Sequence, residues 1–193
     1  TLWVFDLMTQ QSEMVPLPAG LRAYNARWTP DGQKIVFSGE TNSQNFVFAV
    51  RPDGTGLGYL SSGGSEVDPA VSPDGQRIAF HQIYGDVFVV TFDGTGQTNL
   101  GFGIDMVDWS PDGHRLVGTD WAHGGGYHSD LWVWNLTNGV KTKITSRPAD
   151  SAYLRPAWSP DGSKVAAVYV LPTGQTDIVI MNPDGSGIVN LTA

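Results

Sequence analysis

A four-residue sequence, Ser or Thr followed by Pro-Asp-Gly, occurs four times and constrains the fold more than any other feature. The copies begin 43, 38 and 49 residues apart, a period typical of four-stranded propeller blades. Pro presets φ, Asp can hydrogen-bond back to the backbone and Gly accepts a positive φ, so each copy predicts a tight turn. The copies are Thr29–Gly32, Ser72–Gly75, Ser110–Gly113 and Ser159–Gly162.

Apolar residues flank every turn and predict a β-hairpin, and a second hairpin follows each first one. A short apolar run such as Ile35–Phe37 comes after each turn, and a further run such as Val87–Val90 begins the second hairpin. The second run is apolar at successive positions, whereas a strand with one face exposed to solvent would alternate apolar and polar residues. Burial on both faces explains such a run, and stacked blades provide it. Each repeat therefore predicts four antiparallel strands.

The first residues of the chain repeat the second half of a blade. Residues 2–7 align without gaps on residues 131–136, and Met14–Leu17 then predicts the closing strand. We therefore expect an all-β fold over 1–193, a β-propeller with four full four-stranded blades and an N-terminal half blade. The predicted boundaries are 1–20 for the half blade and 21–63, 64–103, 104–148 and 149–193 for the full blades.

The predicted half blade lacks its first two strands, which would leave its leading strand with an open edge. Three explanations stay open. The chain is part of a larger propeller, such as a six-bladed ring; another subunit supplies the strands; or the ring tolerates one thin blade.

Charge and composition exclude several classes of protein. Lys and Arg number 11 against 19 Asp and Glu, and the net charge of −8 disfavours nucleic acid and anionic membranes as partners. The chain has no Cys, which excludes disulfides and thiolate chemistry. No apolar run is long enough to span a bilayer. The chain begins at Thr1, so we expect either a removed signal peptide or a segment of a longer protein.

The last repeat carries a family resemblance in three of its parts. Pro156–Ala166 reads Pro-Ala-Trp-Ser-Pro-Asp-Gly-Ser-Lys-Val-Ala, Asp177–Gly187 reads Asp-Ile-Val-Ile-Met-Asn-Pro-Asp-Gly-Ser-Gly, and Asn190–Thr192 reads Asn-Leu-Thr. This pattern, which recurs over nearly the whole chain, resembles the WD-like repeat of TolB-type β-propellers. The resemblance implies a periplasmic or extracellular location and protein partners. Related propellers belong to prolyl-oligopeptidase-like hydrolases or act as sugar-degrading lyases.

The turn aspartates are predicted to be structural, because Asp is a turn former in this context. The set is Asp31, Asp74, Asp112 and Asp161. The Asp-Gly-Thr-Gly segments of the second hairpins lack the spacing of an EF-hand, so we predict no calcium there.

The longest predicted loop, Thr119–Asp130, is rich in side chains that bind metals or proteins. It contains Asp120, Trp121, His123, Tyr127, His128 and Asp130. Two His and two Asp can bind a divalent metal, but their spacing matches no established motif. We therefore predict a contact surface for a partner rather than a metal site, with a solvated insertion as the alternative.

Polar side chains also begin the strand that enters each blade. They are Arg22, Asn25, Glu66, Asp68, Asp105, Asp108, Asp150 and Arg155. Acidic groups predominate, and a channel mouth of this kind suits a cationic peptide segment. The interpretation that we favour is that these groups satisfy one another or the loop backbone.

Motifs for catalysis are missing from the sequence. It contains no Gly-x-Ser-x-Gly elbow and no phosphate-binding loop, and His occurs four times. We predict a non-catalytic, exported scaffold without cofactor that binds a protein or peptide. The alternatives are a propeller domain of a larger hydrolase and a propeller lyase or hydrolase acting on sugars. The predicted partner-binding residues are Asp68, Asp105, Asp120, Trp121, His123, Tyr127, His128 and Arg155.

Overall fold

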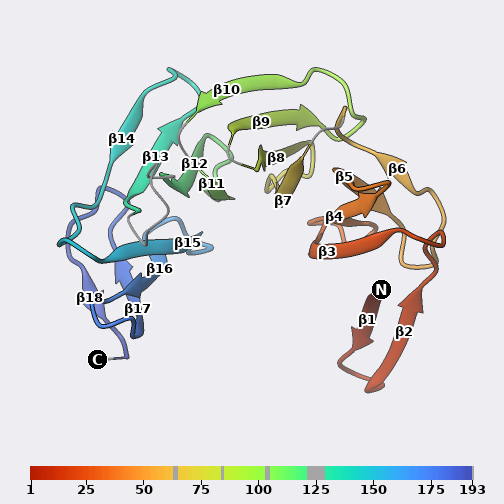
Figure 1. Cartoon of the computed structure of the whole chain (residues 1–193), viewed down its shortest axis with the longest axis horizontal. Helices are drawn as coiled ribbons and strands as arrows, with labels where there is room; N and C mark the ends of the chain where they lie inside the picture. Colours follow the sequence, from red (N-terminus) through yellow and green to blue (C-terminus); the bar gives the residue numbers. More distant parts are fainter. Residues whose placement is uncertain (63–64, 84, 103–104, 121–128, 193) are drawn as a thin grey trace. The chain divides into compact units, whose positions relative to one another are not determined.

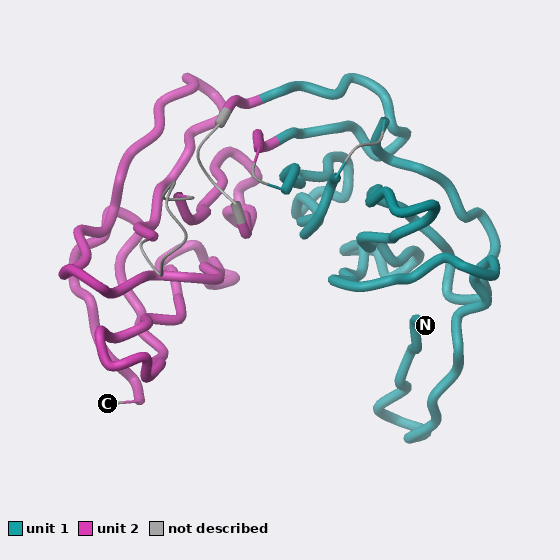
Figure 2. Tube along the Cα trace, viewed as in Figure 1, with its two compact units in different colours: residues 1–83, 88–99 teal, residues 84–87, 100–193 magenta. Residues whose placement is uncertain are grey.

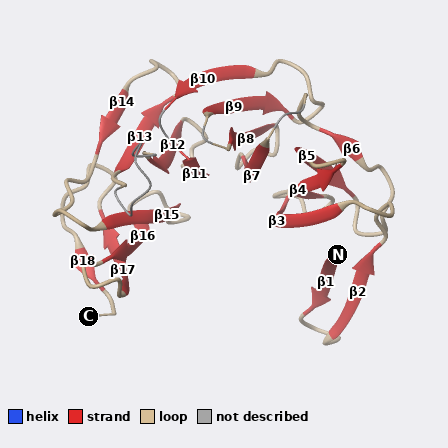
Figure 3. Ribbon diagram, in the orientation of Figure 1, coloured by secondary structure: helices blue, strands red, loops and turns tan. Residues whose placement is uncertain are grey.

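The structure is a computed structural model that describes residues 1–62, 65–83, 85–102, 105–120 and 129–192. Within these ranges, every regular element is a β-strand (Figure 3). No helix in the described part of the chain is long and apolar enough to cross a membrane. The chain divides into two compact units, residues 1–83 with 88–99 and residues 84–87 with 100–193 (Figure 2). Each unit is described by itself.

Unit 1 begins with a two-stranded sheet, followed by a four-stranded one (Figure 1). The first sheet pairs β1 with β2 in antiparallel fashion, and the second has the order β3-β4-β5-β6. The strands are β1 (Leu2–Asp6), β2 (Gln11–Val15), β3 (Arg22–Trp28), β4 (Ile35–Thr41), β5 (Gln44–Val50) and β6 (Gly58–Tyr59).

A third sheet has the order β10-β9-β8-β7, and its last two strands in sequence include residues assigned to both units. Its strands are β7 (Glu66–Val71), β8 (Arg77–Gln82), β9 (Asp86–Thr91) and β10 (Thr98–Phe102).

Unit 2 contains two further four-stranded antiparallel sheets, β11-β12-β13-β14 and β15-β16-β17-β18. The strands of the first are β11 (Asp105–Trp109), β12 (Arg115–Thr119), β13 (Leu131–Asn135) and β14 (Lys141–Lys143). Those of the second are β15 (Ala152–Trp158), β16 (Val165–Val170), β17 (Thr176–Met181) and β18 (Val189–Asn190). The predicted all-β fold of four-stranded antiparallel blades is thus confirmed.

Each Ser/Thr-Pro-Asp-Gly sequence closes the hairpin between the first two strands of its sheet through side-chain hydrogen bonds. In the first copy, Thr29 Oγ1 donates to Asp31 Oδ1 at 2.6 Å, and Gln33 N donates to the same oxygen at 3.0 Å. These bonds favour the ionised carboxylate, so the pKa of Asp31 lies below its usual value. The same network lowers the pKa of Asp74 and Asp112, and that of Asp161 to about 2. The turn aspartates therefore stabilise their own loops.

Apolar side chains fill the space between neighbouring sheets of one unit. In unit 1, Leu2 and Val4 of β1 pack against a cluster that includes Phe37 and Phe48, which are 0% and 2% exposed. In unit 2, a cluster around Trp158 joins strands of the last two sheets. The successive apolar residues of β5 are buried from Val47 to Val50, as expected for a strand covered on both faces.

Two glycines allow the outer turn of one sheet to touch the preceding sheet. Gly185 has a φ of +85°, and a Cβ added there would lie 1.7 Å from the carbonyl oxygen of Ile144. Gly54 has a φ of +83°, and its Cβ would lie 2.7 Å from the oxygen of Pro16. Only glycine combines this conformation with so close an approach.

Candidate functional site

The first strand of each four-stranded sheet contains a β-bulge at the same place in the repeat. The register shifts between Tyr24 and Arg27 in β3, and in the corresponding segments of β7, β11 and β15. One non-glycine residue inside each bulge has a positive φ. These residues are Asn25 (52°), Asp68 (53°), Met106 (48°) and Arg155 (51°). Their spacing equals that of the Pro-Asp-Gly turns, so the bulge belongs to the repeat.

The left-handed conformation at the bulge costs free energy, and the cost depends on the side chain. Asn25 and Asp68 tolerate it because their short polar groups can bond locally, whereas Met106 and Arg155 bear a cost of roughly 1–2 kcal/mol. A bulge redirects the side chains of its strand, and strain of this kind tends to persist at functional sites. The four equivalent positions carry an amide, a carboxylate, a thioether and a guanidinium on one backbone geometry.

The bulges of unit 1 are joined by a polar cluster. Asn25 Nδ2 donates to Asp68 Oδ1, and the other oxygen of Asp68 lies 3.2 Å from His81 Nε2. The backbone N–H of Asp68 donates to Ser38 Oγ at 3.0 Å. The side chain of Asp68 is 34% exposed, whereas that of His81 is 10% exposed. Asp68 is thus held on three sides and keeps one side toward solvent.

Further polar contacts surround this cluster. The hydroxyl of Tyr24 donates to Asn45 Oδ1, and burial, with the nearby charges of Glu40 and Asp68, raises the pKa of Tyr24. Glu66 is fully buried, and Ser61 Oγ donates to its Oε2 at 3.2 Å. In unit 1, Asn25 and Asp68 of two first strands therefore bond to each other, whereas Tyr24 and Glu66 bond to side chains outside the first strands.

The bulges of unit 2 differ in chemistry. Arg155 is exposed on β15, and Asp108 Oδ2 accepts a hydrogen bond of 2.7 Å from the backbone N–H of Trp158. Asp105 lies at the first position of β11, and its side chain is outside the described part of the structure. Asp108 therefore fastens β11 to β15, while Arg155 is directed to solvent.

The two ends of the long loop are held by Asp120 and Asp130. Asp120 accepts hydrogen bonds from the backbone N–H of Asp130 at 2.5 Å and from Trp132 Nε1 at 3.1 Å. Asp130 is 5% exposed and lies 2.6 Å from Lys143 Nζ. Both carboxylates therefore anchor the loop, a local role that loop composition alone did not indicate. Trp121, His123, Tyr127 and His128, predicted here as partner contacts, lie outside the described residues.

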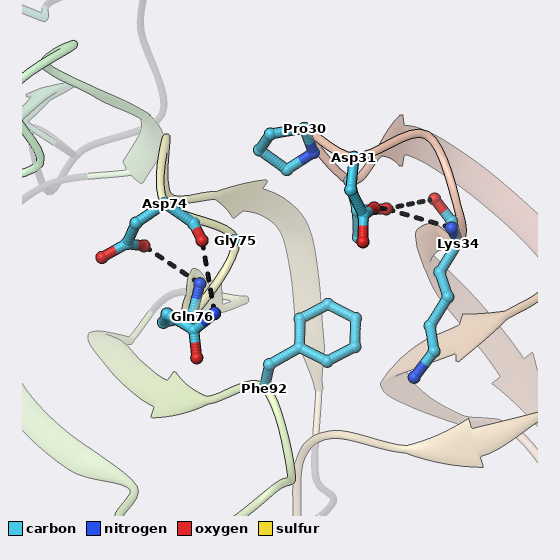
Figure 4. Close-up of a pocket in the computed structure, with 8 residues that line it drawn as sticks. Pro30, Asp31, Lys34, Asp74, Gly75, Gln76 and Phe92 are labelled. Carbon is cyan, nitrogen blue, oxygen red and sulfur yellow. Dashed lines mark hydrogen bonds between the residues drawn. The ribbon is translucent and has the colours of Figure 1, made fainter.

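A groove in unit 1 lies between two Pro-Asp-Gly turns, with a volume of about 480 Å³. Figure 4 shows the ring of Phe92 between the turn of Asp31 and that of Asp74, with Lys34 beside it. Lys34 Nζ is 4.8 Å from the ring centroid, a cation–π contact. Both carboxylates bond within their own turns, which leaves the groove a mixed surface without a dedicated polar centre.

Among the residues that the structure describes, no three His, Asp or Glu side chains come together in a way that could hold a metal ion. The contact between His81 and Asp68 is of a kind used for proton transfer. Sequence reasoning singled out Asp68 but missed His81. The repeat did contain a signal for His81. This residue occupies the position that Ser38 has one repeat earlier, and Ser38 accepts a hydrogen bond from the bulge residue Asp68 of the next sheet.

No family model matches the chain. Solved structures match it over nearly its whole length. An Agrobacterium tumefaciens protein assigned as TolB superposes with a TM-score of 0.81 and 20% identity, over 94% of this chain and 69% of that one. TolB from Acinetobacter baumannii superposes with a TM-score of 0.78 and 19% identity, over 98% of this chain and 48% of that one. The chain has a TolB-like β-propeller fold.

The TolB-like fold is shared by proteins of other activities. An oligogalacturonate lyase in complex with manganese superposes with a TM-score of 0.71 and 15% identity, over 98% of this chain and 58% of that one. At these identities the likeness concerns the fold alone, because one propeller backbone supports many functions. The predicted resemblance to TolB-type propellers is confirmed at this level.

Proposed function

We propose that this TolB-like propeller is a non-catalytic, exported scaffold that binds a protein or peptide through the bulges of its first strands. One observation carries the proposal: a strained backbone position recurs in four sheets and bears four different side chains. A purely architectural position would favour Gly or Asn throughout, since these residues tolerate a positive φ. Met106 and Arg155 instead suggest that the side chain is selected for contact.

In unit 1 the partner group is a cation. Asp68 is held by Asn25, His81 and Ser38, and it keeps a third of its side chain exposed. A pre-positioned carboxylate binds an Arg or Lys side chain with little loss of its own freedom. The net charge of −8 would further attract a basic segment.

In unit 2 we propose Arg155 and Asp105 as contacts with an acidic and a basic group of the partner, respectively. Asp120 would contribute by holding the ends of the 119–130 loop, and Trp121, His123, Tyr127 and His128 remain proposed contacts on that loop. The periplasmic or extracellular location remains a proposal that rests on the resemblance to TolB-type propellers.

Selection of displayed twelve-residue peptides on the immobilised chain tests this function. The expected binders contain Lys or Arg, and Asp68→Asn weakens them by about tenfold or more, since a hydrogen bond to a charged group is worth roughly 1.5–3 kcal/mol. Asp161→Asn makes the same change of charge in a turn and serves as the matched control. Selection of peptides without basic residues, or an equal loss in both variants, would contradict the proposal.

A sugar-degrading enzyme is the second candidate, because His81 and Asp68 form a pair able to transfer a proton. Oligogalacturonate incubated with the chain, with and without Mn²⁺, tests it through the absorbance of an unsaturated product. Turnover abolished by His81→Ala would replace the scaffold with this candidate, and no turnover under either condition would remove it.

A further inference from the structure

The turn between β13 and β14 departs from the pattern of the other outer turns. In the other three four-stranded sheets, the turn after the third strand contains Asp-Gly, and its carboxylate accepts hydrogen bonds within the turn, as that of Asp184 does. Residues 135–140 instead read Asn-Leu-Thr-Asn-Gly-Val, without a carboxylate. Two amides replace it: Asn135 Oδ1 accepts the N–H of Thr137 at 2.9 Å, and Asn138 Oδ1 accepts another backbone N–H at 3.0 Å. A departure from a local rule that the repeat otherwise keeps points to a functional position.

This turn borders a groove between the two four-stranded sheets β11–β14 and β15–β18, with a volume of about 610 Å³. A volume of this size is ordinary for sites that take small molecules. The floor of the groove is apolar and buried, since Val133 is 8% and Ile144 is 7% exposed. Around the rim lie Arg115, Asn135, Asn138 and Val140 of the first sheet and Pro183 and Asp184 of the second.

The register of the first sheet brings Arg115 and Asn135 together. The two residues lie directly opposite each other on β12 and β13, which places their side chains on one face of the sheet, about 5 Å apart at Cβ. One nitrogen of the Arg115 guanidinium lies 3.3 Å from Asp112 Oδ2 in an exposed ion pair. The other side-chain N–H groups of Arg115 donate no hydrogen bond to the residues that the structure describes. Most of the guanidinium is therefore available to a ligand.

The equivalent pair of the last sheet, Lys164 and Asn182, shows what Arg115 and Asn135 lack. Lys164 Nζ donates to Asn182 Oδ1 at 2.7 Å, so this cation has an acceptor across its sheet. The oxygen of Asn135 is engaged by the N–H groups of its own turn, and its Nδ2 donates to none of the described residues. A guanidinium and an amide NH₂ group thus lie side by side as donors, and an acceptor from outside would satisfy both.

The surface of the groove suits an acid with an apolar part. A carboxylate only accepts hydrogen bonds, and its two oxygens fit the planar fork of a guanidinium. Val140, which is 53% exposed, and Pro183 supply apolar surface beside the donors. Hydrogen bonds from the hydroxyl and N–H of Ser186 lower the pKa of Asp184, so this exposed carboxylate is charged at neutral pH and disfavours a second anionic group on the ligand.

We propose that this groove binds an organic monocarboxylate of small-molecule size. The carboxylate accepts hydrogen bonds from the Arg115 guanidinium and from Asn135 Nδ2, and the apolar part of the ligand lies on Val140 and over the buried floor. The same chemistry occurs in a free organic acid and at the C-terminus of a short peptide. The site uses none of the bulge residues, so it is a binding function in addition to the proposed scaffold role.

Two pairs of probes that differ in charge test the proposal by calorimetry on the full chain. The pairs are phenylacetate with phenylacetamide, and N-acetyl-leucyl-leucine with its C-terminal amide. At least one acid should bind, and its amide should bind about tenfold or more weakly, because hydrogen bonds between charged groups are stronger than those to a neutral amide. The acid that binds more tightly identifies the source, a free acid or a peptide terminus. Equal binding of acid and amide, or no binding at millimolar concentration, would overturn the proposal.

Variants of the two donors locate the site. Asn135→Asp keeps the oxygen that closes the turn but replaces the NH₂ donor with a second carboxylate oxygen, so acid binding should fall about tenfold or more. Asn42→Asp, in an exposed loop of unit 1, adds the same charge and should leave it unchanged. Arg115→Gln should abolish the preference for acid over amide, and Arg115→Lys should restore part of it. Asp68→Asn should leave acid binding unchanged, so failure of this site is distinct from failure of the scaffold function.

The side-chain amide signals in NMR spectra of the parent chain provide a test that does not depend on the folding of a variant. The acid that binds should shift the NH₂ signals of Asn135, whereas those of Asn190, which already donate to Asp177 outside the groove, should move little. Shifts that leave Asn135 unaffected would overturn the proposal, as would a loss of acid binding in Asn135→Asp no greater than that in Asn42→Asp.

Discussion

The hairpins β1–β2 and β13–β14 begin with nearly the same sequence and have different surroundings. Residues 2–7 read Leu-Trp-Val-Phe-Asp-Leu, and residues 131–136 read Leu-Trp-Val-Trp-Asn-Leu. Phe5 is 55% exposed, whereas its equivalent Trp134 is 6% exposed. Leu131 is fully buried, while Leu2 is only partly so. The same local pattern therefore forms the same strand in both places, and burial follows from the strands and sheets beside it.

The comparison teaches that strand formation and stabilisation are separate properties in this repeat. Both hairpins pair in antiparallel register, so the local sequence suffices for pairing. Hydrophobic stabilisation scales with the apolar area removed from water, and it therefore depends on the neighbours. The following predictions use matched positions to test this separation.

The largest effect is expected for the paired aromatic positions. Trp134→Ala should lower the free energy of unfolding by about 3–5 kcal/mol, because it empties a buried site and removes the contact of Lys141 with the ring. Phe5→Ala should cost less than about 1 kcal/mol, since most of the ring is already in water. Urea denaturation of both variants measures the difference in unfolding free energy. Equal losses would contradict the separation of strand formation from stabilisation.

The next effect concerns the close approach of outer turns. Gly185→Ala should destabilise by about 2–4 kcal/mol, from the positive φ together with overlap with the Ile144 carbonyl. Gly174 has a φ of +83° with nothing near its Cβ, so Gly174→Ala should show the conformational cost alone, roughly 1–2 kcal/mol. Thermal unfolding of the pair isolates the contact between the sheets. Similar melting temperatures would show that the turn can move away.

A smaller effect, common to both units, is expected from acid. Hydrogen bonds from the Ser159 hydroxyl and then from the Ser163 N–H lower the pKa of Asp161 to about 2, from an ordinary 3.8. A carboxyl group whose pKa is lower in the folded than in the unfolded state stabilises the fold fully at pH values above its unfolded pKa. For Asp161, this stabilisation is lost as the pH falls from 3.8 toward 2. Urea midpoints between pH 6 and pH 2 should therefore fall less steeply for Asp161→Asn than for the parent chain.

The turn of Asp31 in unit 1 provides the matched test of the acid effect. The pKa of Asp31 is lowered by the equivalent hydrogen bonds from Thr29 and Gln33. Asp31→Asn should therefore also make the urea midpoint fall less steeply between pH 6 and pH 2. A response confined to one unit would show that the turns are not locally independent.

The smallest effect is expected for an exposed ion pair. Arg22 and Glu40 approach to 3.7 Å with side chains 80% and 37% exposed. Such pairs contribute roughly 0–1 kcal/mol, so Arg22→Ala should change the unfolding midpoint little at low salt and not at all at high salt. A larger loss would indicate that β3 is held mainly by this contact.

Much of the fold could be predicted from the sequence because its signals are local and repeated. The Pro-Asp-Gly turns encode their own geometry through side-chain bonds within about five residues, as Thr29 and Asp31 illustrate. The candidate site could be predicted only in part. Asp68 was visible as a polar residue on a first strand, but its pairing with His81 and Asn25 joins residues of three strands. Asp120 was visible as a charged loop residue, and its bond to Trp132 was not.

By itself the sequence determined the period, the turns, the apolar strands and the absence of Cys. These features depend on backbone preferences and on the pattern of apolar residues over a few positions, so they can be inferred from the local sequence. Only the tertiary structure decided that four equivalent bulges have a positive φ, and that Trp158 is covered and Trp28 is not. The reason is that burial, strain and pairing are set by groups far apart in the chain.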